Sequence, residues 1–167
     1  MPLKAENTAH ISDGAVFVLD AGQHVCTPVE ILYFSTDKDA PTKPKFYHRN
    51  IFVLNDGAAI TLVENFQGQG TYACNHVTDI SLHENSRLNH YRLQNDGENA
   101  YHFAHTRLMQ HAKSHYETVT CTTGAVFSRH DIQALLIGRE VSCNINGLYM
   151  LNKKQHYDTK ILADHME

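Results

Sequence analysis

One turn pattern recurs along the chain and joins apolar segments with no helical spacing between them. In each full copy, an apolar residue is followed by two residues, a turn-forming residue, two more residues and a second apolar residue, and a degenerate copy runs from Gln110 to Tyr116 with Lys113 at its turn position. The turn positions are Gly22, Gly57, Asn85, Lys113 and Gly138, which lie 35, 28, 28 and 25 residues apart. Glycine and asparagine suit such turns because they tolerate a positive φ angle. A period of this length predicts a repeat architecture, in which each unit buries its apolar face against its neighbours.

The segments between these turns are typical of short strands, because they are rich in β-branched and aromatic residues. Residues 106–112 could form a helical turn by propensity, but their place in the repeat favours a strand. We therefore expect an all-β solenoid with little or no helix, forming a single domain over residues 1–167. The inner face is predicted to carry Val18, Val53, Ile80, Leu82, Ile132 and Leu148.

Composition narrows the class of protein. The chain is 42% hydrophobic and 19% charged, which predicts a folded domain with a substantial core. A net charge of −4 argues against a nucleic-acid partner, and no apolar run approaches the length of a membrane span. The N-terminus lacks the apolar core of a signal peptide. Four cysteines without a CxxC pair predict reduced thiols in a cytoplasmic protein.

Histidine is the compositional outlier, with 13 residues. Most of them stand in polar or turn-flanking positions, as His24 and His83 do, and are predicted to be solvated. His111 and His115 have the i, i+4 spacing of helical metal ligands, but they flank a predicted turn and no further ligand stands nearby. His102 and His105 are likewise incomplete.

The C-terminal residues His156, Asp158 and His165 are the remaining candidate metal ligands, because imidazole and carboxylate groups suit iron or zinc. In a strand, His156 and Asp158 would point to one face. A surface network of aspartate and histidine is the simpler interpretation, so we expect no tightly bound metal.

Two enzymatic interpretations find little support. Residues 68–73 (Gly-Gln-Gly-Thr-Tyr-Ala) imitate a dinucleotide-binding loop, but a β pattern follows where that motif needs a helix. A β-helix enzyme acting on carbohydrate usually groups carboxylates on one coil face. Here Asp79, Glu84 and Asp131 are scattered by the repeat. We predict no catalytic residue and no bound cofactor for this chain.

Several short segments, taken in order, resemble the SufB/SufD family, and within it SufD more than SufB. They are residues 7–15, 62–66, 90–94, 148–151 and 154–158, with the closing pair Asp164 and His165. The resemblance implies a right-handed parallel β-helix and a role in iron–sulfur cluster assembly. In that family, SufD pairs with SufB, and the two engage the ATPase SufC. Their complex assembles clusters from a persulfide sulfur supply with ATP hydrolysis.

The sequence departs from the family by omission. The family continues past the Asp-His position with further coils, a motif bearing cysteine and histidine, and a helical domain that docks on the ATPase. It also has an N-terminal helical region. We therefore expect this fragment to bind no cofactor itself and to meet the iron–sulfur cluster and ATP only through the full complex.

The prediction for function is a non-catalytic scaffold component of the SUF machinery, acting with a SufB-like paralogue and a SufC-like ATPase. No nucleic acid and no membrane is expected as a partner. An end in mid-pattern predicts a homodimer through the coil at residues 148–161, because unpaired strand edges are templates for pairing. The alternatives are an autonomous His-rich metal-binding β protein and a β-helix carbohydrate-active enzyme.

Overall fold

The structure, a computed structural model, describes residues 2–38, 40, 42–152 and 154–166. Within these residues it contains one helix and eleven strands. The elements are α1 (Pro2–His10), β1 (Val16–Leu19), β2 (Val29–Thr36), β3 (Lys45–Leu54), β4 (Ala59–Gln69), β5 (Ala73–Leu82), β6 (Arg87–Asn95), β7 (Tyr101–Gln110), β8 (His115–Thr122), β9 (Phe127–Leu136), β10 (Ser142–Tyr149) and β11 (His156–His165).

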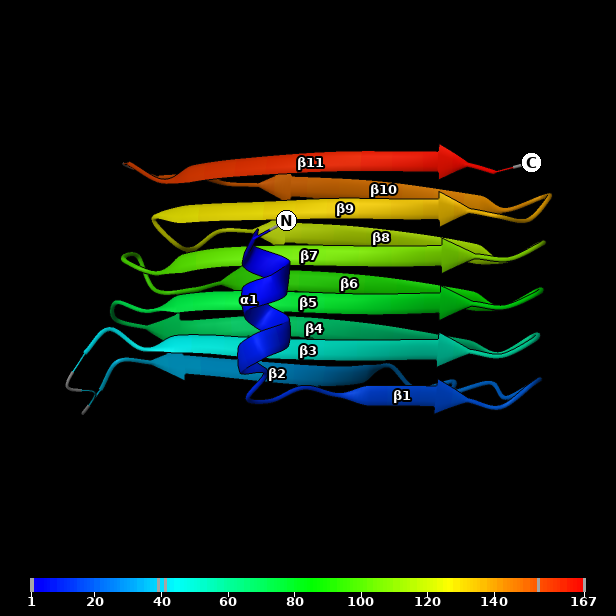
Figure 1. Cartoon of the computed structure of the whole chain (residues 1–167), viewed down its shortest axis with the longest axis horizontal. Coiled ribbons are helices and arrows are strands. Elements are labelled where there is room, and N and C mark those ends of the chain that lie inside the picture. The colour runs from blue at the N-terminus through cyan, green and yellow to red at the C-terminus, as the bar shows by residue number, and fades with distance from the viewer. Residues whose placement is uncertain (1, 39, 41, 153, 167) are drawn as a thin grey trace.

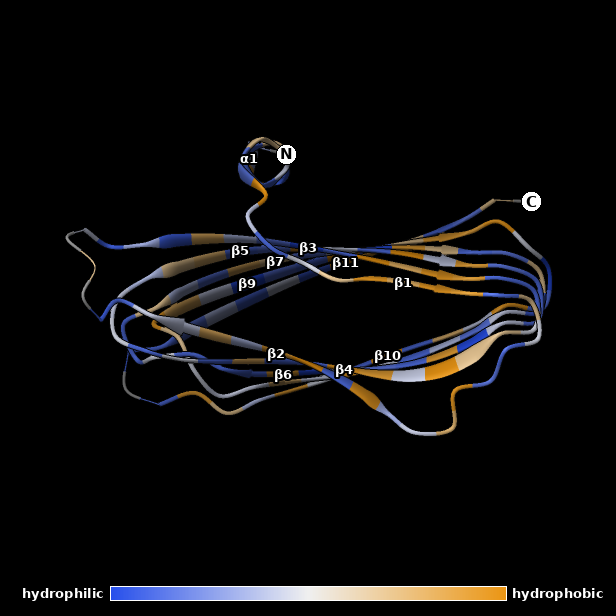
Figure 2. Cartoon of the chain, turned by 90° about the horizontal axis from the view of Figure 1, so that it is seen from below, coloured by the Kyte–Doolittle hydropathy of each residue, from blue (hydrophilic) through white to orange (hydrophobic). Residues whose placement is uncertain are grey.

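The strands form two parallel sheets that lie face to face (Figures 1 and 2). The odd strands form sheet A, in the order β1-β3-β5-β7-β9-β11, and the even strands form sheet B, in the order β2-β4-β6-β8-β10. Each coil contributes one strand to each sheet, so the strand of the opposite sheet serves as the crossover that parallel pairing requires. Partner residues in neighbouring coils lie 26 to 35 positions apart. This spacing matches the turn period and confirms the predicted all-β solenoid, a parallel β-helix.

The recurring turns form a ladder along one edge of the two sheets. Gly22, Gly57, Asn85 and Lys113 all have a positive φ angle, between 58° and 71°. The backbone N–H of each donates to a carbonyl in the turn of the next coil, at 2.8–3.1 Å. The prediction that Lys113 occupies a turn position is therefore confirmed, although lysine lacks the conformational freedom of glycine.

The fifth predicted turn position, Gly138, is wrong. The residue with the positive φ angle in that turn is Glu140, at 58°, and the N–H of Lys113 donates to the carbonyl of Arg139 just before it. Gly138 is needed for a different reason. A Cβ at this position would lie 2.0 Å from the backbone nitrogen of Ala112, so only glycine lets the two coils approach so closely.

The interior is layered along the strands. An apolar layer lies next to the turn ladder, where alternate strand residues point inward. Its buried members are Leu19, Phe52, Leu54, Ala58, Ile60, Leu62, Ile80, Leu82, Leu88, Leu108, Tyr116, Ala134 and Leu136. A smaller apolar cluster of Tyr72, Cys74, Ala100 and Ala125 lies towards the opposite edge of the sheets. Polar side chains fill the space between the two clusters.

The predicted inner face was correct in the middle of the chain and wrong at its ends. Ile80, Leu82 and Ile132 are buried, whereas Val18 and Leu148 are 58% and 54% exposed. Val18 lies in register with Val53, which is only half-buried and stands between the buried residues Phe52 and Leu54. The sequence of β1, Val-Phe-Val-Leu, is apolar throughout, so alternation could not reveal which residues point inward.

The helix α1 was not expected from the sequence. It packs on the outer face of sheet A, against β3 and β5 (Figure 2). The side-chain amide of Asn7 is buried there and donates to the carbonyls of His48 (2.9 Å) and Asn75 (2.8 Å), and Asn75 in turn donates to the carbonyl of Leu3. In the described part of the chain, no helix has the length and apolarity needed to span a membrane.

Candidate functional site

The polar layer of the interior is centred on Glu64, which points inward from β4 and is completely buried. Its two carboxylate oxygens face five donors on the neighbouring strands. Oε1 accepts from Asn50 Nδ2 (2.6 Å), Thr78 Oγ1 (2.9 Å) and His76 Nε2 (3.0 Å), and Oε2 accepts from Arg92 Nε and His90 Nε2 (both 3.0 Å). Such complete hydrogen bonding is what a buried carboxylate requires.

Arg92 is the matching buried cation, projecting inward from β6 with 2% of its surface exposed. Besides its contact with Glu64, its guanidinium carbon lies 4.9 Å from the centre of the Phe66 ring, a cation–π contact. Its two terminal nitrogens point at the rings of His130 (3.3 Å) and His102 (3.4 Å). The network of Glu64, Arg92 and these rings therefore connects strands of both sheets.

The protonation states follow from burial and from these contacts. Burial alone would raise the pKa of Glu64, but the facing His76 and His90 and their hydrogen bonds hold it well below its ordinary value. Burial lowers the pKa of His76, and burial together with Arg92 lowers that of His130 well below its usual range. The pair of Glu64 and Arg92 is therefore ionised at neutral pH, and the ring of His130 beside Arg92 is neutral.

A second group extends the network towards the edge of the sheets. Cys74, Asp96 and His102 are buried, and their ligand atoms all lie within 4.8 Å of one another, as in a metal site. Arg92 can only donate, so its contact makes His102 Nε2 an acceptor and puts the ring proton on Nδ1. Nδ1 lies 2.9 Å from Asp96 Oδ2, although in a bent geometry that leaves neither atom a good hydrogen bond.

This protonation pattern weighs against metal binding by the same three residues. A metal ion would have to displace the Nδ1 proton of His102 while Arg92 still occupied the other ring nitrogen. Burial also raises the pKa of the Cys74 thiol to about 12, so the thiolate that a metal needs is disfavoured. Asp96 is already held by Tyr72, whose hydroxyl donates to Oδ1 at 2.9 Å. The arrangement is better described as a chain of buried polar contacts that runs from Glu64 through Arg92 and His102 to Asp96.

The structure does not bring the candidate metal ligands of the C-terminal strand together. His156 stacks on Phe127 with ring centres 5.3 Å apart, and Asp158 accepts a hydrogen bond from Arg129 Nη1 at 2.8 Å. Both point to the outer face of sheet A. His165 lies at the far end of β11 and, by the alternation of the strand, on the opposite face.

Sequence reasoning placed too many histidines on the surface. His24 is exposed, but His48, His76, His90, His102, His105 and His130 are buried. A usable signal was present in the repeat period. His48 and His76 are 28 residues apart, as are the turn positions Gly57 and Asn85, and the two histidines are register partners in the structure. Histidines that share the repeat spacing belong to one column of the β-helix.

The fold and this interior define a class of protein: a parallel β-helix whose coils enclose a buried, hydrogen-bonded polar layer. Residues 34–167 match the SufBD core domain of the SUF system for FeS cluster assembly. The chain belongs to the SufBD family, which confirms the resemblance seen in the sequence and its link to iron–sulfur cluster assembly.

Two curated relatives show how much of a longer protein the match covers. The chain is 29% identical over 161 residues to Protein ABCI7, chloroplastic, of Arabidopsis thaliana, covering 92% of this chain and 34% of that protein. It is 28% identical over 163 residues to an iron-sulfur cluster assembly SufBD family protein of Synechocystis, covering 92% and 36% respectively. The chain therefore spans about a third of the length of these relatives.

Proposed function

We propose that this chain is a non-catalytic scaffold component of the SUF machinery, acting in the cytoplasm with a SufB-like paralogue and a SufC-like ATPase. The match to the SufBD core domain over residues 34–167, from the end of β2 through β11, carries the proposal. The closed interior supports it, since its ionised groups Glu64 and Arg92 bind each other and are shielded from solvent. In this proposal the iron–sulfur cluster is cargo of the whole complex, and ATP is hydrolysed by the ATPase.

The surface for a protein partner is proposed at the coil of β10 and β11. These two strands are the outermost members of their sheets, so each has one backbone edge without a strand partner in the described part of the chain. Leu148, Tyr149, Ile161 and Leu162 are each at least 50% exposed there. Exposed edges with apolar side chains favour strand pairing with another chain. In the absence of a paralogue, we propose that the 167-residue chain forms a homodimer through this coil.

The test is affinity capture of a SufB-like paralogue and a SufC-like ATPase from the same organism by the purified chain, with light scattering of the chain alone. We expect capture of the paralogue and a dimeric mass, and capture of the ATPase only when the paralogue is present. Ile161→Lys should abolish both associations. Leu32→Lys is the matched control, because Leu32 is 56% exposed on the edge strand β2 at the other end. A monomer that captures neither protein, or equal effects of both variants, would contradict the proposal.

A further inference from the structure

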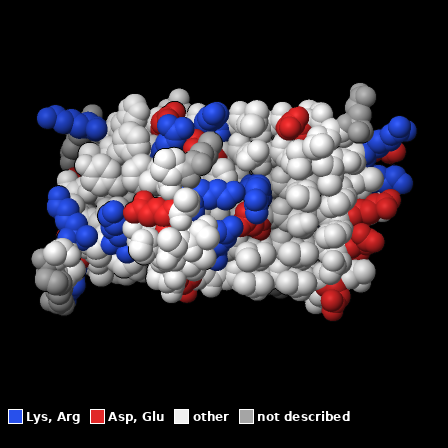
Figure 3. All heavy atoms as spheres, viewed as in Figure 1, with Lys and Arg blue, Asp and Glu red and all other residues white. Residues whose placement is uncertain are grey.

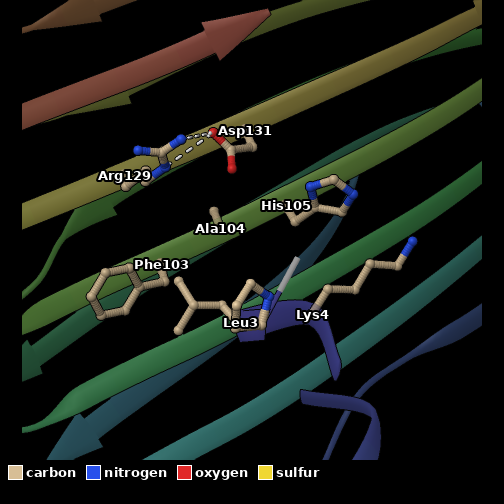
Figure 4. A pocket seen from close by; sticks show the side chains of 8 residues that line it. Leu3, Lys4, Phe103, Ala104, His105, Arg129 and Asp131 are labelled. Atoms are coloured by element: carbon tan, nitrogen blue, oxygen red, sulfur yellow. Dashed lines mark hydrogen bonds and ion pairs between the residues drawn. The ribbon is translucent and has the colours of Figure 1, made fainter. Parts of the chain in front are cut away.

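A groove on the outer face of sheet A carries a site that the scaffold role does not use. It lies between the first turn of α1 and the strands β7 and β9, and its volume is about 250 Å³ (Figure 4). Pro2, Leu3 and Lys4 of α1 form one wall, and residues 103–105 of β7 with Arg129 and Asp131 of β9 form the other. The polar layer of Glu64 and Arg92 lies on the inner side of the same sheet, so the two sites are separate.

His105 is the group in this groove that lacks a partner. Its side chain points away from the interior, yet only 9% of the residue is exposed, and neither ring nitrogen has a hydrogen-bond partner among the described residues. Burial lowers its pKa, and the nearby Lys4 lowers it further, so the ring is neutral and offers one donor and one acceptor. A buried polar group left unpaired destabilises the folded chain, and a ligand that pairs with it removes that penalty.

Lys4 supplies an unbalanced positive charge beside this ring. Three arginines balance three carboxylates around the groove as a set, in the pairs Arg49–Asp79, Arg107–Asp79, Arg129–Asp131 and Arg129–Asp158. Among the described residues, no carboxylate lies within ion-pair distance of the Lys4 ammonium. Burial and then the neighbouring Arg107 lower the pKa of Lys4. Figure 3 shows these basic and acidic side chains interspersed on the face that carries α1.

The rest of the groove is apolar and small. Figure 4 shows Leu3 and Phe103 next to each other in the lining, and His105 between the Lys4 side chain and the pair of Arg129 and Asp131. Its volume is just below the range of roughly 300–1,000 Å³ typical of ligand pockets. A fitting ligand therefore has one anionic head and a short apolar body.

We propose that this groove binds a small organic monocarboxylate. The carboxylate accepts hydrogen bonds from the Lys4 ammonium and the N–H of neutral His105, and charge-assisted bonds of this kind are among the stronger ones. The aliphatic part of the ligand packs against Leu3 and Phe103. Asp131 does not repel the ligand strongly, because Arg129 Nη2 holds it at 3.1 Å.

The experiment is an NMR titration of the ¹⁵N-labelled chain with hexanoate, and with hexanol and hexylamine as probes of the same length. We expect saturable shifts of the His105 ring resonances with hexanoate, and about tenfold weaker binding of the other two. Lys4→Met keeps the alkyl chain and removes the charge, so it should weaken hexanoate binding by at least about fivefold. His105→Phe keeps the ring and removes the N–H, and should do the same.

The matched controls are Lys113→Met and His83→Phe. Both residues lie in turns of the turn ladder and do not line the groove. They should leave hexanoate affinity unchanged. Saturable binding of hexylamine as tight as that of hexanoate would overturn the proposal, and so would an absence of His105 shifts or unchanged affinity in both groove variants. Each of these readouts concerns ligand binding to the chain itself, so failure here leaves the proposed scaffold role standing.

Discussion

Removing the buried cation Arg92 should strongly destabilise the protein. Arg92→Met is the sharpest perturbation, because methionine keeps much of the side-chain volume beside Phe66 while leaving the carboxylate of Glu64 without its ion-pair partner. Glu64 is 0% exposed, so water cannot solvate the charge that remains. Breaking one side of such a buried pair costs about 3–5 kcal/mol of unfolding free energy. Hydrogen bonds from Asn50 and Thr78 persist and place the expected value at the lower end of that range.

The assay is a double-mutant cycle with Glu64→Gln, followed by urea unfolding monitored by circular dichroism. Glu64→Gln alone also leaves a buried charge, now on Arg92, and should destabilise the protein as well. The double variant contains neither charge, so its loss should be smaller than the sum of the two single losses by at least about 1 kcal/mol. The control is Lys45→Met, since the Lys45 side chain is 63% exposed in its 3.3 Å pair with Glu6, and exposed pairs contribute at most about 1 kcal/mol. Additive losses around the cycle, or an Arg92→Met loss no larger than that of Lys45→Met, would refute the reasoning.

Three further predictions follow from single positions. Burial, and then His76, lowers the pKa of His48 to about 4. Between pH about 6.5 and 4, the unfolded chain therefore binds a proton that the folded chain excludes. Urea titrations should show the free energy of unfolding falling by about 3 kcal/mol as the pH drops through that window. A free energy that does not change with pH would contradict this prediction. Gly138→Ala should lower the thermal midpoint, because the new Cβ would clash with the Ala112 backbone. Lys113→Gly should raise the free energy of unfolding by about 0.5–1 kcal/mol, because glycine adopts the φ angle at this position freely. A stabilising Gly138→Ala with a destabilising Lys113→Gly would contradict the assigned turn ladder. In thiol labelling of the native protein, exposed Cys26 should react well before Cys74, whose pKa is raised to about 12 by burial, and equal rates would be inconsistent with the buried position.

The architecture could be predicted because each turn is local chemistry repeated at a fixed distance. Glycine or asparagine at a positive φ angle marks its turn directly, as Gly57 and Asn85 do. The last turn was misplaced because Glu140 holds the same φ angle without a residue that signals it, while a nearby glycine serves the contact between coils. The helix α1 has no strong amphipathic pattern, so nothing in its sequence distinguished it from an extended N-terminal segment.

The buried polar layer was missed for a physical reason. A glutamate or an arginine in a strand of alternating polarity normally lies on the solvated face. Alternation alone therefore predicts that Glu64 and Arg92 face solvent. They can point inward because they lie 28 residues apart in register, on adjacent strands of sheet B, so that each neutralises the other. Pair spacing equal to the coil period therefore indicates partners on adjacent strands, and only the structure shows that this pair faces inward whereas Asp79 and Arg107, with the same spacing, face outward.

The position of this layer also bears on how the coils find their register. A shift of one residue turns the inward face of a strand outward, but a shift of two restores it, so apolar alternation alone tolerates the second error. Sliding β6 by two residues against β4 would separate Arg92 from Glu64 and leave each buried charge without its ion-pair partner. The polar layer therefore destabilises a two-residue shift that leaves the packing of the flanking apolar layers nearly unchanged. Specifying the register in this way is the best-attested role of buried polar groups. The double variant of the Glu64 and Arg92 cycle bears on this directly. If the layer selects the register, that variant retains strand content yet shows duplicated amide resonances in β4 and β6, and a single set would assign register to the turns instead.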